Sequence, residues 1–159
     1  MSADTQLLVF LLEGQRYALP LGTVERIVQA AEITPLPQAP PIVLGALDVA
    51  GTILPVLNVR RRFRLPERDI HPSDHFLLAR AGDRTVALLI DAAADVIELS
   101  RTQIIPADAV APGLEHIQGV ARMSDGLILI HDLESFLSLD EAAALDRAMN
   151  AQEEVLHGA

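Results

Sequence analysis

The side chains best suited to bind a metal ion lie together in one short segment, residues 70–76. His71, Asp74 and His75 fall within it, and imidazole nitrogens and carboxylate oxygens are common zinc ligands. However, His71 precedes Pro72 in an expected loop, His75 starts an expected strand, and no third histidine is near in the sequence. We therefore interpret the segment as a surface loop and predict no metal site.

Three further carboxylates have spacings that could support catalysis. Asp91 and Asp95 follow an apolar strand, and paired carboxylates can act as general acid and base. Because both flank the alanine run 92–94, we interpret them as residues that cap a turn. Asp48, in the segment LDVAG, partly matches the Asp-Thr/Ser-Gly loop of aspartic proteases. The hydroxyl residue is missing and the glycine is one position late, which favours a plain hairpin turn.

An arginine run is the third candidate for chemistry. It consists of Arg60, Arg61, Arg62, Arg64 and Arg68. Guanidinium groups bind phosphate well, but in an acidic chain we interpret this run as a solvated linker between two units. The motifs G-x-S-x-G, G-x-G-x-x-G and the P-loop are absent. The sequence therefore predicts an interaction module, without an enzymatic activity and without a cofactor.

The composition narrows the classes of function further. The 159 residues are 50% hydrophobic and 21% charged, and they include neither cysteine nor lysine. This excludes disulfides, cysteine-bound zinc and Schiff-base chemistry. The net charge of −10 opposes binding to nucleic acid.

The longest apolar run, residues 7–12, is far below the roughly 20 residues of a membrane helix, so we expect no direct membrane insertion. The first residues lack the basic start of a secretion signal, and we expect a cytoplasmic protein.

An internal repeat organises the elements that position these residues. Gly14-Gln15-Arg16 recurs as Gly82-Asp83-Arg84, 68 positions later, and each follows an apolar run. Gly45 recurs as Gly119, 74 positions later, in a second matching segment. The chain is therefore one unit written twice, with half-units at approximately 6–64 and 75–137. Each half is small for a core of its own, so we expect the two halves to pack on each other.

Short apolar strands and glycine turns predict an all-β fold. The expected strands are Gln6–Leu12, Arg16–Pro20, Val24–Ala31, Gly45–Val49, Thr52–Val59, His75–Ala81, Thr85–Ile90, Asp95–Leu99, Ile117–Arg122 and Gly126–His131. After them, Ser138 and Glu141 have the spacing of a capping box, which predicts a helix over 139–156. An apolar stripe on this helix should lie on the barrels; it comprises Leu139, Ala142, Leu145 and Met149.

The order of motifs from about Gln6 to Leu137 resembles the chemotaxis coupling proteins, the CheW family. The family's Tyr-Ala-Ile-Pro motif appears as YALP at 17–20, its Pro-x-Pro as PLP at 35–37, its central hairpin from Gly45 to Pro55, and its Val-Asp-x-Val as IDAA at 90–93. The resemblance implies a single domain over 1–159 made of two packed five-stranded SH3-like barrels with a C-terminal helix. It also implies a scaffold that binds the regulatory domain of a CheA-type histidine kinase and the cytoplasmic tip of a methyl-accepting chemoreceptor, at receptor arrays.

By motif matching, the resemblance also implies a receptor groove. Its residues would be Leu21, Val24, Arg26, Ile27, Gly45, Ala50, Val86 and Val96. The apolar members are equally well explained by core packing. Arg26 stands where the family has Glu, and Ala50 where it has Arg; in the family these two lie on neighbouring strands. The chain is thus a divergent member, which could serve a divergent pathway. A small-ligand-binding β-barrel and a small β-fold hydrolase are the rival classes.

Overall fold

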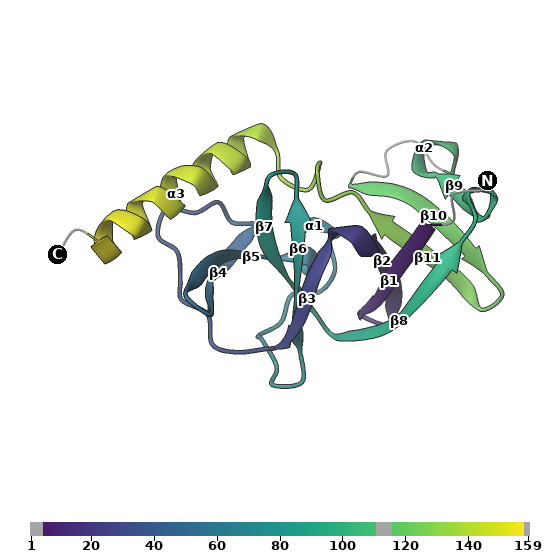
Figure 1. Cartoon of the computed structure of the whole chain (residues 1–159), viewed down its shortest axis with the longest axis horizontal. Coiled ribbons are helices and arrows are strands. Elements are labelled where there is room, and N and C mark those ends of the chain that lie inside the picture. The colour runs from purple at the N-terminus through teal and green to yellow at the C-terminus, as the bar shows by residue number, and fades with distance from the viewer. Residues whose placement is uncertain (1–4, 111–115, 158–159) are drawn as a thin grey trace.

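The computed structural model describes residues 5–110 and 116–157. Strands dominate these residues, with one long helix near the end (Figure 1). The strands are β1 (Thr5–Leu12), β2 (Gln15–Pro20), β3 (Val24–Gln29), β4 (Val43–Val49), β5 (Thr52–Leu57), β6 (His75–Ala81), β7 (Arg84–Ile90), β8 (Ala92–Leu99), β9 (Ile104–Pro106), β10 (Ile117–Met123) and β11 (Gly126–His131). The helices are η1 (Leu21–Thr23), α1 (Val59–Arg62), η2 (Arg101–Gln103), α2 (Ala107–Val110) and α3 (Leu139–His157).

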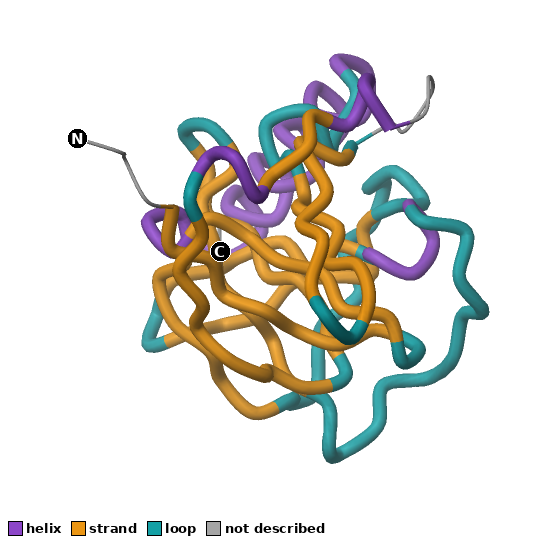
Figure 2. The backbone as a smooth tube through the Cα atoms, turned by 90° about the vertical axis from the view of Figure 1, so that its right-hand side faces the viewer, coloured by secondary structure: helices purple, strands orange, loops and turns teal. Residues whose placement is uncertain are grey.

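The strands form two sheets, which confirms the predicted all-β fold class. The first sheet has the order β8-β1-β2-β11-β10-β9 and the second has the order β3-β6-β7-β5-β4. The three-residue strand β9, which the sequence did not predict, pairs with β10 and adds a sixth strand to the first sheet. Figure 2 shows the strands wrapped around the centre, with the longest loops running along the outside.

Each sheet contains strands from both half-units. The β1–β2 hairpin joins β8, β10 and β11 of the second half, while the β6–β7 hairpin joins β3, β4 and β5 of the first half. The pairing directions match as well, because β2 runs parallel to β11 and β7 runs parallel to β5. The sequence repeat is therefore visible in the fold as a mutual exchange of strands.

The core of the two sheets has three parts, because the central strands are buried on both faces; a smaller fourth cluster lies between α3 and the connector before β4. In β1, Leu7 and Val9 face the interior of the first sheet, while Leu8 and Phe10 join a cluster that spans both sheets. In β7, Leu89 faces the interior of the second sheet and its neighbours face the shared cluster. Alternate residues of a strand point to opposite faces. The side chains of one continuous apolar run therefore pack into two different clusters of the core.

Gly45 and Gly119 have the same role in the two halves. A Cβ at Gly45 would lie 2.5 Å from the carbonyl oxygen of Thr34, and one at Gly119 would lie 2.9 Å from the Ile104 side chain. Thr34 exchanges two backbone hydrogen bonds with Ala46, the residue after Gly45. These glycines let a neighbouring segment pack closely against β4 and β10.

Two expected strands end earlier than predicted. The strand expected over Val24–Ala31 ends at Gln29. The strand expected over Thr52–Val59 stops at Leu57, because the Asn58 side chain accepts a hydrogen bond of 3.0 Å from the Arg61 amide and starts α1. Such side-chain capping satisfies a backbone amide at the first turn of a helix. The arginine run thus begins in a helix and not in a linker.

The capping box before α3 is confirmed. The Glu141 amide donates to the Ser138 hydroxyl at 3.0 Å, and the Ser138 amide donates to the Glu141 carboxylate at 2.9 Å. Part of the predicted apolar stripe is wrong, since the Leu139 side chain is 91% exposed while Leu145 is fully buried. Leu145 packs with Ala148 and with Leu36 of the connector before β4, so α3 covers the side of the second sheet (Figure 1).

Candidate functional site

The predicted receptor groove begins on η1 and β3, an edge strand of the second sheet. Leu21, Val24 and Ile27 are half-buried and pack against the cluster shared by the two sheets. Arg26 is exposed on the same strand. β3 thus carries two exposed charged side chains, Glu25 and Arg26, between apolar ones. It is an edge strand, and among the described residues its outer backbone groups have no partner strand in the second sheet.

The other predicted groove residues are in four different settings. Val96 is 54% exposed on β8, one of the two edge strands of the first sheet. Ala50 is exposed at the β4–β5 turn with a φ of 51°. Val86 is fully buried in the shared cluster, and Gly45 is buried against Thr34. Val86 is therefore a core residue that cannot itself contact a partner in this structure.

Arg26 and Ala50 do not lie on paired strands. In the second sheet β3 and β4 are the two opposite edges, separated by β6, β7 and β5. We expected these two positions to lie on neighbouring strands. This expectation is wrong, because β3 and β4 are not hydrogen-bonded to each other. Glu25, next to Arg26, accepts a hydrogen bond of 3.1 Å from the Thr85 hydroxyl.

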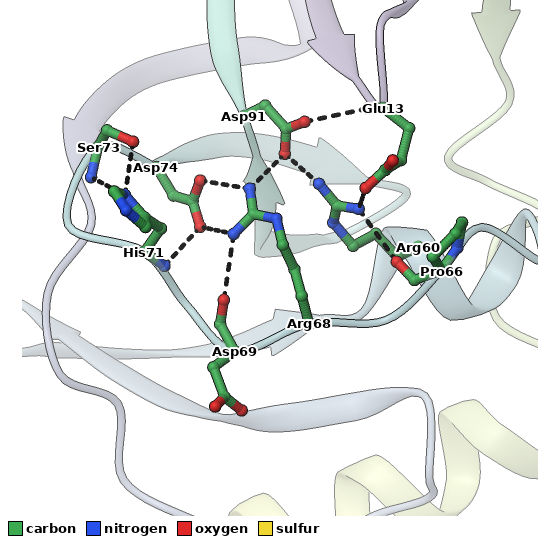
Figure 3. Close-up of polar contacts among 9 residues, drawn as sticks. All are labelled: Glu13, Arg60, Pro66, Arg68, Asp69, His71, Ser73, Asp74 and Asp91. Carbon is green, nitrogen blue, oxygen red and sulfur yellow. Dashed lines mark hydrogen bonds and ion pairs between the residues drawn. The ribbon is translucent and has the colours of Figure 1, made fainter.

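A cluster of arginines and carboxylates lies where α1, the loop before β6 and the start of β8 meet (Figure 3). Arg60 binds the carboxylates of Glu13 and Asp91 and donates a bond of 3.0 Å to the Pro66 carbonyl. Arg68 makes a bidentate pair with Asp74, at 2.8 and 2.9 Å, and contacts Asp91 at 2.9 Å. We call these five charged side chains the arginine–carboxylate cluster.

The cluster corrects three expectations from the sequence. Arg60 is 4% exposed and Asp74 is 1% exposed, so neither belongs to a solvated linker or a surface loop. Asp91 does more than cap a turn, because it also accepts a 3.0 Å hydrogen bond from the Glu13 amide and pairs with both arginines. The cluster joins the β1–β2 turn to α1, β6 and β7, so it holds the two sheets together.

The charges in the cluster stabilise one another. Burial by itself would raise the pKa of Asp74, but hydrogen bonds from Arg68 and from the His71 amide hold that pKa below its usual value. Burial lowers the pKa of Arg60, and the hydrogen bonds to Glu13 and Asp91 outweigh this effect and raise it overall. Hydrogen bonds to Asp74 raise the pKa of Arg68. Asp74, Arg60 and Arg68 therefore stay charged near neutral pH.

The described residues offer little for catalysis by a metal. No group of three or more His, Cys, Asp or Glu side chains among them is placed to hold a metal ion. His71 instead shares a hydrogen bond of 2.8 Å with the Ser73 hydroxyl.

Among the helices of the described residues, none is long and apolar enough to cross a membrane.

Comparison with known proteins decides the family. The model of the CheW-like domain matches residues 6–141. The chain belongs to the CheW-like domain family. The chemotaxis protein CheW of Treponema pallidum is 28% identical over 146 residues, covering 88% of this chain and 86% of that protein. CheW of Bacillus subtilis is 25% identical over 150 residues, covering 90% of this chain and 94% of that protein.

Two other matches extend the comparison. Protein FrzA of Myxococcus xanthus is 26% identical over 125 residues and covers 76% of both chains. The crystal structure of the scaffolding protein TtCheW from Thermoanaerobacter tengcongensis superimposes with a TM-score of 0.79 at 24% identity. That superposition covers 87% of this chain and 96% of TtCheW. The CheW-like fold of the chain thus extends over nearly all of a scaffolding protein's length.

Proposed function

We propose that this CheW-like protein is a non-catalytic adaptor that couples a methyl-accepting chemoreceptor to a CheA-type histidine kinase. The observation that carries the proposal is the family match over residues 6–141 together with the two-sheet fold of a scaffolding protein. The adaptor would act in the cytoplasm, at receptor arrays. Its partners would be the regulatory domain of the kinase and the cytoplasmic tip of the receptor.

The exposed edges of the two sheets support a binding role. β3 presents Glu25 and Arg26 between half-buried apolar side chains, and β8 presents Val96 at 54% exposure. Edge strands offer unpaired backbone groups and side chains to a partner. We propose that the receptor contacts Leu21, Val24, Arg26 and Ile27 directly. Gly45 and Val86 would support that surface from within, since both are buried.

The packing of the sheets does not favour a ligand-binding barrel. The interior of the first sheet is filled by buried side chains such as Val9 and Ile128, and that of the second by Val56 and Phe76. Small barrels are normally filled in this way. The hydrolase alternative lacks support too, because the described carboxylates with geometry for chemistry, Asp74 and Asp91, are occupied by arginines.

Titration calorimetry with the purified kinase regulatory domain and a receptor-tip fragment tests the adaptor role. We expect each domain to bind with a dissociation constant of tens of micromolar or tighter. Absence of heat and of co-elution with both domains at such concentrations would refute the proposal.

Arg26 and Ala50 are expected to set which receptor is recognised. Charge complementarity affects partner choice more than folding, and both side chains are exposed. The double substitution Arg26→Glu with Ala50→Arg should gain binding to an ordinary chemoreceptor and lose binding to the native one. Equal binding of both receptors by both proteins would place these positions outside the interface.

A further inference from the structure

An open groove of ≈ 790 Å³ lies at one end of the second sheet. Its walls are the segment that follows β3, residues 30–33, and the loop before β6, residues 67–72. We call the apolar part of the lining the floor of the groove; it consists of Ile33, Leu44, Ile70 and Leu89. Ile33, Leu44 and Ile70 are only partly buried by the core beneath them, so the groove leaves apolar surface in water.

Two arginines line this groove, and carboxylates of the arginine–carboxylate cluster already balance the charge of both. The guanidinium of Arg60 is held by Glu13 and Asp91, and that of Arg68 by Asp74 and Asp91. These contacts satisfy the arginines inside the arginine–carboxylate cluster (Figure 3). The groove therefore presents no excess positive charge from its own lining.

The acidic residues of the rim are not neutralised in the same way. Glu32 and Asp69 make no ion pair within the described part of the chain, and Figure 3 shows the Asp69 carboxylate directed away from Arg68. Glu67 accepts a hydrogen bond from Asn58 and lies 3.8 Å from Arg61. Three carboxylates, those of Glu32, Glu67 and Asp69, thus line the groove beside its apolar floor, and this arrangement attracts a cation attached to an apolar group.

We propose that this groove binds a protein segment in which an apolar side chain is flanked by Arg or Lys. The apolar side chain covers Ile33 and Ile70, and the basic side chains pair with Glu32 and Asp69. An acidic or phosphorylated segment is excluded by the charge of the rim. A free metal ion or a small amine would leave the apolar floor uncovered. The groove is distinct from the receptor-facing residues on η1 and β3, so this chain has a second surface for a partner.

Two short peptides of opposite charge test the chemistry of the groove, independently of the adaptor function. The Ile33 and Ile70 methyl groups are followed by NMR while acetyl-Arg-Leu-Arg-amide or acetyl-Glu-Leu-Glu-amide is added. The basic peptide should shift both methyl signals saturably, and the acidic peptide should leave them unchanged. The Glu32→Gln/Asp69→Asn variant should bind the basic peptide about tenfold more weakly, because each exposed ion pair contributes about threefold.

A matched control variant, and binding assays with the kinase and receptor domains, complete the experiment. Asp83→Asn removes an exposed carboxylate from the β6–β7 turn and should leave peptide binding unchanged. Unshifted methyl signals, equal binding of both peptides, or unaltered binding by the double variant would overturn the proposal. Shifts that depend on the protein's own concentration would overturn it in favour of a second copy. If the peptides bind as expected but the kinase and receptor domains do not bind at all, the adaptor function fails and the groove proposal stands.

Discussion

Replacing His131 with phenylalanine is expected to make the protein less sensitive to acid. His131 is 1% exposed at the end of β11, and its ring lies 4.4 to 5.3 Å, between centroids, from the rings of Phe63, Tyr17 and Phe10. Neither ring nitrogen has a hydrogen-bond partner. Burial, followed by the nearby His116, lowers the pKa of His131 from 6.5 to about 3.

This shift sets the size and the sign of the effect. Between pH 6.5 and about 3 the unfolded chain binds a proton at residue 131 that the folded protein does not bind, so the free energy of unfolding falls as the pH falls. One pKa unit corresponds to roughly 1.4 kcal/mol. The proton that the unfolded chain binds at residue 131 therefore lowers the free energy of unfolding by about 2 kcal/mol at pH 5. At pH 7 it lowers this free energy by almost nothing.

Urea denaturation of the wild type and of His131→Phe at pH 7, 6 and 5 measures this difference. The wild type should lose about 2 kcal/mol more than the variant between pH 7 and pH 5. Asp74 and Glu141, whose pKa values are lowered, lose their stabilisation only below this window. Phe136→Leu, in the same aromatic cluster, is the control and should lower stability equally at each pH. Parallel pH curves for wild type and His131→Phe would refute the reasoning.

Three further substitutions test the fold by denaturation. Arg60→Ala should cost about 3 kcal/mol, because it removes a buried guanidinium and its hydrogen bonds to Glu13, Asp91 and the Pro66 carbonyl. Arg61→Ala, at an exposed pair of 3.8 Å, should change stability by less than about 1 kcal/mol; equal losses would contradict the role of the cluster. Gly45→Ala should cost about 1–3 kcal/mol through its clash, while Gly22→Ala meets open space and should be tolerated sterically. Ser138→Ala should cost about 1 kcal/mol by removing the cap of α3, and an unchanged midpoint would argue against that cap.

The strands and the final helix could be predicted because their signals are local. Apolar runs of strand length, the Gly-x-Arg turns and the Ser138–Glu141 spacing each lie within a few residues, and the strands were found within two or three residues of their ends. β9 was missed because three residues ending in Pro106 carry almost no periodic signal. Leu139 was misplaced because a narrow stripe does not show which side of a helix faces the protein.

The arginine–carboxylate cluster could not be predicted because its contacts are distant in sequence. Arg60 is separated by 47 residues from Glu13 and by 31 from Asp91. A run of arginines in an acidic chain has the same composition whether it is solvated or paired. Only the arrangement of the two sheets brings Glu13, Asp74 and Asp91 to the same place. The same holds for the exchange of strands, since the repeat alone is compatible with two separate barrels.

That exchange has a consequence for how the chain can be divided. A protein cut between α1 and β6 would yield two fragments, and neither would contain all the strands of either sheet. The fragments could complete both sheets only by associating with each other. By the same geometry, two copies of a single ancestral half-unit would build this architecture as a symmetric, interlocked dimer. Tandem fusion of those copies then frees the two halves to diverge, so that one chain can present different surfaces at equivalent places.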